Sequence, residues 1–462
     1  MTLIKSISGI RGTIGGEVGE NLTPIDAVKF ASAYGTWIKQ QREKDHYRVV
    51  VGRDARISGE MIQNLVMNTL VGLGIHVVDL GLSTTPTVEV AVPMEHADGG
   101  IILTASHNPK QWNALKLLDA KGEFLNGEEG AKILEIAEGT DMSFADVDSL
   151  GKITINDAYI DLHIDEVLDM ELVNVEAIKK AKFKVVVDGV NSTGGIAIPL
   201  LLERLGVHPV KLFCEPNGHF PHNPEPLKEH LTDLSKAVVK EHADFGIVVD
   251  PDVDRLAFMD EKGEMFGEEY TLVACADYVL SKTKGNTVSN MSSTRALRDI
   301  TEKHGGTYEA SAVGEVNVVA LMKKNNAVIG GEGNGGIIYP ELHYGRDALV
   351  GVALFLSLLA EKKMDVSDLR ASYPNYFMSK KKIQLTPDLD VDGILSTMES
   401  NYSHENLTTI DGVKIDFTDS WVHLRKSNTE PIIRIYTEAP SQHEADSLAD
   451  RIISEIKAIA NI

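Results

Sequence analysis

The sequence predicts a multidomain α/β protein with mainly parallel sheets, followed by a smaller α+β unit at its C-terminal end. The length of 462 residues corresponds to about three or four domains, at roughly 100–200 residues each. Short β-branched runs alternate with amphipathic helical patterns, which is the order that parallel βαβ units produce. The last stretch combines a strand-like run with one long helix, which we expect to pack on a small sheet.

Three β-branched runs end in loops that are rich in polar residues or glycine. These runs are Arg48–Val51, Lys184–Val187 and Gly246–Val249. In parallel α/β sheets, ligands bind beyond the carboxyl ends of the strands. We therefore expect the functional residues in the loops that follow such runs.

Capping residues predict the start of two helices. Thr23 is an N-cap residue, and Pro24 follows it at the first helical position. The residues from Ser441 to Glu444 form a capping box, and apolar residues follow at helical spacing. A long amphipathic helix at the C-terminal end is therefore expected.

We expect four domains, although the limits between them have weaker signals than the helices. The expected ranges are 1–155, 156–259, 260–371 and 372–462. Residues 157–168 have a helical pattern that bridges the first two ranges, and residues 373–376 have the composition of a linker.

Composition and charge argue against several classes of protein. The net charge of −23 disfavours a nucleic-acid partner, and an anionic ligand needs a locally basic pocket. Only two cysteines occur, so no more than one disulfide is possible. Residues 1–12 contain no apolar run of signal-peptide length, and Leu349–Ala360, the longest apolar stretch, is too short to cross a bilayer. We expect a cytoplasmic protein with no membrane partner, and a buried helix at Leu349–Ala360.

A serine motif follows the apolar run 100–103 and reads Thr104-Ala105-Ser106-His107-Asn108-Pro109-Lys110. A buried strand thus delivers Ser106 into a turn that ends at Asn-Pro. Two interpretations are open, a phosphate-accepting or nucleophilic serine with basic neighbours, and a capping serine in an ordinary turn. A Ser-His hydrolase is disfavoured because adjacent side chains of an extended segment point apart, and the chain has no G-x-S-x-G elbow.

An acidic triplet follows the run 246–249. Asp250, Asp252 and Asp254 alternate in an extended segment and therefore fall on one side of it. Packed together they repel, unless a cation neutralises them or one carries a proton. Oxygen ligands without nearby His or Cys favour Mg²⁺. An EF-hand is disfavoured because Arg255 stands where that loop needs glycine, which leaves a solvated acidic loop as the alternative.

Two later loops carry groups that suit a phosphorylated sugar. Residues 331–336 match G-x-G-x-x-G, but a strand-like run follows, so we reject a dinucleotide site. Glu332 and Asn334 suit hydrogen bonds to sugar hydroxyls, with a plain hairpin-like turn as the alternative. Residues 425–431 supply donors that suit a phosphate dianion, with a solvated basic turn as the alternative. These donors are Arg425, Ser427, Asn428 and Thr429.

Two further basic residues are candidates, Arg11 near two glycines and Lys116 downstream of the serine motif. Together with the four loops above, they make the sequence resemble the α-D-phosphohexomutase superfamily. That superfamily includes phosphoglucosamine mutases, phosphomannomutases and phosphoglucomutases. The match spans nearly the whole chain, and residues 104–109 and 250–255 are its most specific parts. The resemblance implies a heart-shaped arrangement of three α/β domains and a smaller α+β domain, each with one loop in a central cleft.

The resemblance also implies a mechanism. Ser106 would carry a phosphoryl group, and Mg²⁺ would be held by Asp250, Asp252 and Asp254 with a phosphate oxygen of Ser106. A hexose phosphate would become a 1,6-bisphosphate, turn over in the cleft and return its other phosphate to the serine. Glu332 would bind sugar hydroxyls. The other residues expected to bind substrate are Asn334, Arg425, Ser427, Asn428, Thr429 and Arg434.

Basic residues near the serine would assist proton transfer or support the loops. Arg11 and Lys116 match positions at which related enzymes deprotonate the attacking hydroxyl. Because arginine does not readily lose its proton, Lys116 would be the base if its pKa is depressed. His107 belongs to the expected catalytic set, and Arg255 and Lys110 would support the phosphoserine or metal loop.

The sequence departs from the family pattern in two loops. Residues 333–336 read Gly-Asn-Gly-Gly, where many bacterial members have a serine and often a closing histidine, and Asn428 stands where glycine is common. This variant is similar to phosphoglucosamine and archaeal-type mutases, so we expect glucosamine 6-phosphate as the substrate. Phosphomannomutase or phosphoglucomutase activity is the alternative within the family. A non-catalytic sugar-phosphate sensor and a metal-dependent phosphatase are the alternatives outside it, and the expected assembly is a monomer or homodimer.

Overall fold

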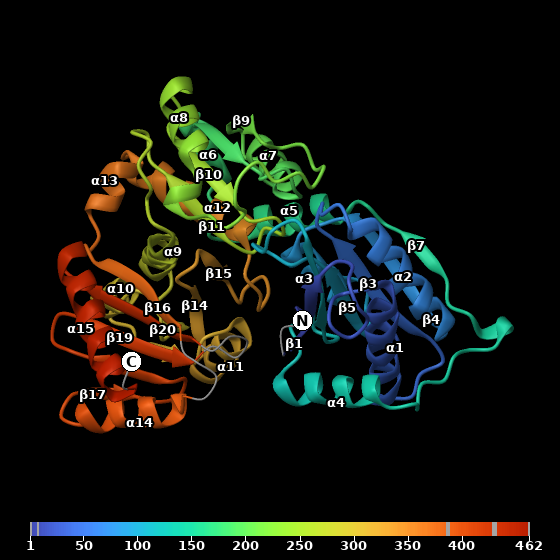
Figure 1. Cartoon of the computed structure of the whole chain (residues 1–462). Helices are drawn as coiled ribbons and strands as arrows, with labels where there is room; N and C mark the ends of the chain where they lie inside the picture. Colours follow the sequence, from blue (N-terminus) through green and yellow to red (C-terminus); the bar gives the residue numbers. More distant parts are fainter. Residues whose placement is uncertain (1, 7–8, 385–388, 427–431, 461–462) are drawn as a thin grey trace.

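The structure, a computed structural model, describes all residues except 1, 7–8, 385–388, 427–431 and 461–462. The described strands form four sheets, which follow one another along the chain. Figure 1 shows the corresponding parts in an arc, with the N-terminal and C-terminal parts at its two ends. Each sheet lies inside one of the four expected ranges, while the limits of those ranges remain predictions.

The first sheet consists of β1 (Ile4–Ser6), β2 (Gly9–Thr13), β3 (Tyr47–Arg53), β4 (Ile75–Leu82), β5 (Gly99–Leu103), β6 (Trp112–Leu118) and β7 (Ile153–Ile155). Its order is β1-β2-β6-β5-β3-β4-β7. The helices are α1 (Pro24–Gln41), α2 (Gly59–Gly72), α3 (Thr85–Met94) and α4 (Gly127–Glu138). Since side chains alternate along a strand, Val49 and Val51 face the core under α1, α2 and α4, while Val50 faces α3.

The second sheet, of order β11-β10-β8-β9, consists of β8 (Lys184–Asp188), β9 (His208–Leu212), β10 (Phe245–Val249) and β11 (Leu256–Met259). Its helices are α5 (Tyr159–Asp169), α6 (Val175–Ala181), α7 (Gly194–Arg204) and α8 (Thr232–Glu241). The helix expected over residues 157–168 is α5, and it packs on α3 and on the third part of the chain.

The third sheet, of order β13-β12-β14-β15, consists of β12 (Asn286–Asn290), β13 (Tyr308–Ser311), β14 (Ala327–Glu332) and β15 (Gly336–Ile338). Its helices are α9 (Glu268–Lys282), α10 (Ala296–Lys303), α11 (Glu315–Asn325), α12 (Ala348–Lys362) and α13 (Val366–Ala371). The apolar stretch Leu349–Ala360 is buried throughout within α12, as predicted. Among the described residues, no helix combines the length and the apolar character needed to cross a bilayer.

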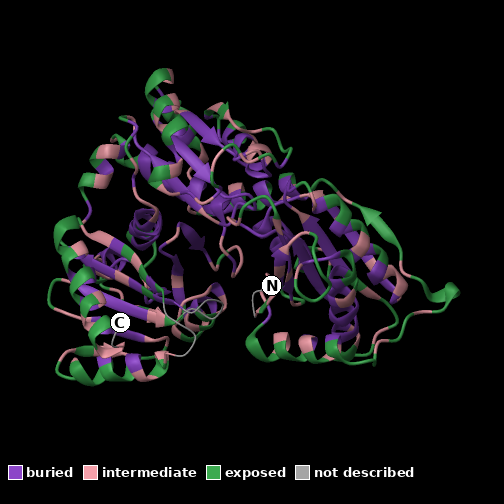
Figure 2. Cartoon of the chain, in the orientation of Figure 1, coloured by how far each residue is buried: buried purple, intermediate pink, exposed green. Residues whose placement is uncertain are grey.

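The fourth sheet is antiparallel, with the order β16-β20-β19-β18-β17. It consists of β16 (Phe377–Gln384), β17 (Asn406–Thr408), β18 (Val413–Asp416), β19 (Trp421–Lys426) and β20 (Ile432–Ala439), with helices α14 (Val391–Asn401) and α15 (Gln442–Ala460). Helix α15 places Leu448, Ile452 and Ile456 in the core of this sheet. Figure 2 shows the result, a buried inner face and an exposed outer face on α14 and α15.

The predicted helix caps are present. Thr23 and Asp26 form a reciprocal capping box at the start of α1, with Pro24 in the first turn. At α15, the Ser441 hydroxyl accepts a hydrogen bond from the backbone N–H of Glu444 (3.2 Å). Both caps satisfy N–H groups that a helix leaves without intrahelical partners, so the sequence determines where these helices begin.

The three α/β sheets share one departure from the predicted parallel pattern. In each, the last strand of the parallel part continues through a loop into an antiparallel neighbour, as β5–β6, β10–β11 and β14–β15. The first two connecting loops contain Ser106 and the acidic triplet, and Glu332 is the last residue of β14, directly before the third loop. The predicted functional loops therefore occupy equivalent positions, at the carboxyl end of a buried strand.

The first two of these hairpins are followed by the same turn, which the sequence repeats as Asp-x-Lys-Gly-Glu at residues 119–123 and 260–264. In each copy the aspartate oxygen accepts backbone N–H groups two and four residues later, at Asp119 and at Asp260. Each turn has its glycine in the left-handed region, at Gly122 (φ 78°) and Gly263 (φ 77°). The shared sequence and hydrogen bonding support an internal duplication of the first and second units.

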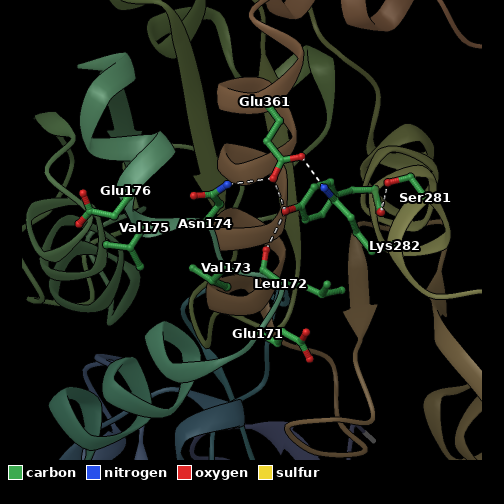
Figure 3. A pocket seen from close by; sticks show the side chains of 10 residues that line it. Glu171, Leu172, Val173, Asn174, Val175, Glu176, Ser281, Lys282 and Glu361 are labelled. Atoms are coloured by element: carbon green, nitrogen blue, oxygen red, sulfur yellow. Dashed lines mark hydrogen bonds and ion pairs between the residues drawn. The ribbon is translucent and has the colours of Figure 1, made fainter.

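A pocket of about 670 Å³ lies on the seam of the second and third parts, and residues 171–176 and the ends of α9 and α12 line it (Figure 3). At its wall, the Glu361 carboxylate accepts hydrogen bonds from Asn174 Nδ2 (3.0 Å), Tyr278 OH (3.3 Å) and Lys282 Nζ (2.6 Å). None of its lining residues belongs to the predicted functional loops, so this pocket is separate from the site described below.

A buried polar seam joins the third and fourth parts. Arg295, at the start of α10, donates to the carbonyl oxygens of Thr418 (3.1 Å) and Ser420 (2.9 Å), and its backbone N–H donates to Glu438 (3.1 Å). Trp421 Nε1 also donates to Glu438 (2.7 Å), and burial raises the pKa of this carboxyl group. Because both charged groups are nearly inaccessible to water, Arg295 supplies the counter-charge that Glu438 needs.

We expect Arg295→Met to lower the free energy of unfolding by about 3–5 kcal/mol, because it leaves Glu438 buried without a cation. The measurement is urea unfolding of the whole chain. Lys381→Met is the matched control, since Lys381 pairs with Asp450 at the surface, where a pair contributes about 1 kcal/mol or less. Equal unfolding curves for the two variants would contradict this account of the seam.

Candidate functional site

Ser106 lies at the junction of the first two sheets. Buried β5 leads into its turn, and its Oγ donates a hydrogen bond to Asp250 Oδ2 on the second sheet (2.6 Å). Its backbone is in the left-handed region (φ 49°), which costs a residue other than glycine about 1–2 kcal/mol. Such a conformation persists only where surrounding contacts enforce it, which identifies the turn as a constrained one.

Arg56 supplies that constraint, and no local sequence pattern pointed to it. Its side chain is 1% exposed, and its guanidinium donates to the carbonyl oxygens of Ser106, Asn108 (2.7 Å) and Pro109 (2.8 Å). Its Nε pairs with Asp54 (2.9 Å), which also accepts from the hydroxyl of Thr104. One buried cation thus holds the serine turn by its backbone and leaves the Ser106 hydroxyl free to face the acidic triplet.

The acidic triplet occupies the loop between β10 and β11. Asp250, Asp252 and Asp254 are completely buried, and one oxygen from each lies within 4.8 Å of the others. Burial, together with the charges of Asp252 and Asp254, holds the pKa of Asp250 well above its usual range. The sequence-based prediction that these carboxylates gather on one side is therefore met in the structure.

The oxygens of the triplet suit a divalent cation. Asp252 Oδ1 and Asp254 Oδ1 are buried and have no hydrogen-bond partner among the described residues. An unpaired buried carboxylate oxygen is costly, and a cation between these oxygens removes that cost. The donor set contains only oxygen, which favours Mg²⁺ over metals that prefer nitrogen or sulfur.

Lys116 and Arg346 are the cations closest to the triplet, and Arg255 lies farther away, 3.9 Å from Asp254. Lys116 Nζ, on β6, contacts Asp252 (2.7 Å) and Asp254 (3.3 Å), and Arg346 contacts Asp254 (2.7 Å). Thr85, at the start of α3, donates its hydroxyl hydrogen to Asp252 as well (2.6 Å). Neither Thr85 nor Arg346 stands in a motif that the sequence analysis recognised.

The surroundings of Lys116 do not meet the condition of a depressed pKa under which it would act as a base. Burial alone would lower the pKa of the ammonium group, but the carboxylates of Asp252 and Asp254 raise it above its ordinary value. The same contacts lower the pKa of Asp254. Burial alone would raise this pKa, but the charges of Arg346 and Lys116 outweigh burial. Lys116 is therefore a charged ammonium group in this structure.

Other predicted basic residues converge on the same place, with one exception. His107 Nδ1 lies 3.3 Å from Ser106 Oγ, and burial together with Arg255 lowers the pKa of this imidazole well below its usual value. Arg255 lies beside the triplet. Its backbone N–H donates a hydrogen bond to Asp250 Oδ1 (3.1 Å), and its guanidinium pairs with Glu225 (3.3 Å). Lys110 is exposed, and no ion pair joins it to another described residue.

The loop of the third sheet is a hairpin turn, in which Glu332 pairs with Gly336. Glu332 is buried and accepts hydrogen bonds from Asn290 Nδ2 (2.8 Å) and Arg346 (2.9 Å). Asn334 donates to Glu332 at 3.5 Å and is partly exposed. Arg346 therefore connects this loop directly to the acidic triplet of the second sheet.

Two of the predicted phosphate-binding arginines lie on the fourth sheet. Arg425 and Arg434 are opposite each other on β19 and β20, and the Arg425 Nε atom pairs with Asp411 (2.9 Å). Burial, then the charge of Arg434, lowers the pKa of Arg11 on β2, so these two cations are electrostatic neighbours. Ser427, Asn428 and Thr429 lie outside the described residues.

Comparison with known families gives four matches in succession. They are the alpha/beta/alpha domains I, II and III and the C-terminal domain of phosphoglucomutase/phosphomannomutase, over residues 3–143, 161–263, 267–376 and 363–455. Together these matches extend over most of the chain.

Individual relatives agree with these matches. A phosphoglucomutase/phosphomannomutase of Thermococcus kodakarensis is 36% identical, with 94% of this chain and 95% of the relative covered. A probable phosphoglucosamine mutase of Methanopyrus kandleri is 32% identical, with 97% of each covered. The crystal structure of a phosphoglucomutase/phosphomannomutase family protein from Burkholderia thailandensis superimposes with a TM-score of 0.84 at 26% identity, with 98% of each chain covered.

We expect Mg²⁺ to stabilise the protein through the acidic triplet. A ligand that binds only the folded state adds about 2.7 kcal/mol at one hundred times its Kd. Asp252→Asn should abolish this increment, because it removes both a charge and an unpartnered oxygen. Thermal unfolding with and without MgCl₂ measures the effect, and Asp233→Asn, an exposed aspartate of α8, is the control. An undiminished increment in Asp252→Asn would exclude the triplet as the Mg²⁺ site.

Proposed function

The chain belongs to the phosphoglucomutase/phosphomannomutase family, and from that premise we propose that it moves phosphate within a hexose phosphate through a phosphorylated Ser106. Membership confirms the resemblance and the four-domain, heart-shaped fold predicted from the sequence, and it makes the chain a phosphohexomutase. The proposal concerns the residue that carries the phosphate, the roles of its neighbours and the sugar.

One observation carries the proposal. The Ser106 hydroxyl lies 2.6 Å from Asp250, beside two buried carboxylate oxygens that have no partner among the described residues. Asp250, Asp252 and Asp254 would hold Mg²⁺, which when bound neutralises charge on a transferring phosphoryl group. A serine held so close to a cation site by Arg56 is suited to accept and return phosphate without moving its backbone.

Basic side chains around Ser106 would compensate the dianion that phosphorylation adds. Lys116, Arg255 and Arg346 already contact the triplet, and His107 lies next to the hydroxyl. Lys116 would act as a base only in a state in which Asp252 and Asp254 have another counter-cation. Because arginine retains its proton, Arg11 would orient and stabilise charge.

Arg425 and Arg434, with Ser427, Asn428 and Thr429, would hold the phosphate that is not reacting. A phosphate group presents the same oxygens from either end of the sugar, so one loop serves both orientations of a 1,6-bisphosphate. Glu332 and Asn334 would bind the sugar hydroxyls. In the structure Glu332 bonds Arg346 and Asn290, so substrate must share or replace these contacts.

We propose glucosamine 6-phosphate as the preferred substrate. The glycine-rich turn at residues 333–336 supports it, and so does the name of the Methanopyrus kandleri relative. A protonated amino group is also attracted by the net charge of −23. The Thermococcus kodakarensis relative, named for glucose and mannose phosphates, motivates the alternative substrates.

We expect the purified chain to contain a fraction of molecules that carry one phosphate, and Ser106→Ala to lack it. Intact-mass measurement detects the phosphate, and an isomerisation assay should show loss of activity in the same variant. Ser403→Ala is the control, because this residue lies in the fourth part of the chain, away from the serine turn. A fully active Ser106→Ala enzyme would refute the phosphoserine mechanism. Release of one inorganic phosphate for each substrate consumed would instead indicate a phosphatase.

We expect kcat/KM to be highest for glucosamine 6-phosphate in a panel with the glucose, mannose and N-acetylglucosamine 6-phosphates. A preference of about tenfold corresponds to 1.4 kcal/mol of differential transition-state binding. The panel is measured with glucose 1,6-bisphosphate present, so that a lack of phosphoserine does not hide activity. Equal or higher efficiency with glucose or mannose 6-phosphate would contradict the proposed sugar and leave the phosphoserine mechanism untouched.

A further inference from the structure

A second cluster of metal-ligating side chains lies in the interior, outside the group that we assign to phosphoryl transfer. Glu89 is on α3, His163 on α5, His343 on the segment between β15 and α12, and Asp347 is the N-cap residue of α12. Glu89, His163 and Asp347 are at most 1% exposed. Segments from three parts of the chain thus meet at one buried point.

The ligand atoms of this cluster are spaced as a metal site requires. The Nε2 atoms of His163 and His343 lie 2.9 Å and 3.1 Å from the same oxygen of Asp347, and all three side chains offer atoms within 4.8 Å of one another. Two ligand atoms that are each about 2.0–2.1 Å from a tetrahedral zinc ion lie ~3.3 Å apart. A small retreat of the Asp347 carboxylate therefore makes room for an ion.

The remaining atoms of the ligands already have orienting partners. His163 Nδ1 lies 3.0 Å from the Thr87 hydroxyl, and His343 Nδ1 lies 3.3 Å from Glu89 Oε2. The other oxygen of Asp347 accepts the N–H of Leu349 (2.8 Å) at the start of α12. Metal-bound histidines typically direct their second ring nitrogen to a carboxylate or another acceptor in this way.

An independent observation points to a cation at this place. Both oxygens of Glu89 are buried without a hydrogen bond among the described residues, and Oε2 faces His343 Nδ1 at 3.3 Å. Gly345 is required for this approach, since a Cβ there would stand 1.8 Å from the Glu89 carboxylate. When both imidazoles are neutral, as metal ligation requires, the two buried carboxylates carry two negative charges, which one divalent ion neutralises.

We propose that His163, His343 and Asp347 bind a divalent transition-metal ion of the zinc type, with Glu89 as an outer-shell carboxylate. Imidazole nitrogen selects such metals, whereas the oxygen-only triplet suits Mg²⁺, so the two sites take different ions. The role of this ion is to position the domains. Two segments connect this cluster to the triplet. On α3, which carries Glu89, Thr85 donates a hydrogen bond to Asp252. On the segment from His343 to Asp347, Arg346 donates to Asp254.

The test is zinc retention by the full-length chain. The chain is stripped with a chelator, loaded with ZnCl₂ and dialysed against buffer with excess MgCl₂, and zinc is measured by elemental analysis. We expect about one tightly held ion per chain, as in other sites with three protein ligands. His343→Gln should release it, whereas Asp252→Asn and the surface variant His304→Gln should retain it.

Cobalt provides a readout that does not depend on a folded variant or on activity. Co²⁺ bound to the wild-type chain should show the visible absorption of a low-coordinate site, and X-ray absorption should show two imidazole ligands. The proposal is overturned if the wild-type chain retains no zinc and gives no such spectrum, because protons alone then hold the cluster. It is equally overturned if zinc is lost in Asp252→Asn and kept in His343→Gln.

Discussion

The concentration of negative charge at the acidic triplet is the constraint on which the site depends. Three fully buried carboxylates cannot all be ionised unless positive charge lies beside them, because burial removes the solvation that favours the charged form. The cations come from different parts of the chain, Lys116 from the first sheet and Arg346 from the third. Ser106 enters the same network as a hydrogen-bond donor to Asp250. Charge compensation therefore brings the three α/β domains together at the site where chemistry is proposed.

Topology explains why the important residues reach that point. Each α/β sheet ends its parallel part in a hairpin to an antiparallel strand, and the serine, the triplet and Glu332 lie in or directly before these hairpin loops. Because the loop leaves a buried strand, its first residues are fixed by the sheet and by its core. The same turn follows β6 and β11, so the first two units share this local structure beside the serine loop and the acidic triplet.

Local patterns predicted the fold class, the capped helices and the serine and aspartate loops, because each of these depends on residues that are close together in the sequence. Arg56, Thr85 and Arg346 were missed because each acts on a loop that is distant in sequence, and an isolated Arg or Thr carries no local signal. The direction of the pKa shift of Lys116 was left open for the same reason. Burial ordinarily lowers the pKa of a lysine. Here the charges of Asp252 and Asp254 outweigh that effect, and their proximity to Lys116 depends on how two domains pack.

The two ends of the arc present like charges to each other. Burial, and then the charge of Arg434 on β20, lowers the pKa of Arg11 on β2, so the two guanidinium charges repel each other. A phosphate dianion between the two guanidinium groups replaces this repulsion with two attractions, and a bidentate arginine contact is among the strongest hydrogen-bonded pairs in proteins. The fourth domain is in turn fixed to the third through Arg295 and Glu438. If the fourth domain holds the non-reacting phosphate as proposed, binding of that phosphate offsets the repulsion between the two guanidinium groups, and Arg295 links the position of the fourth domain to the third.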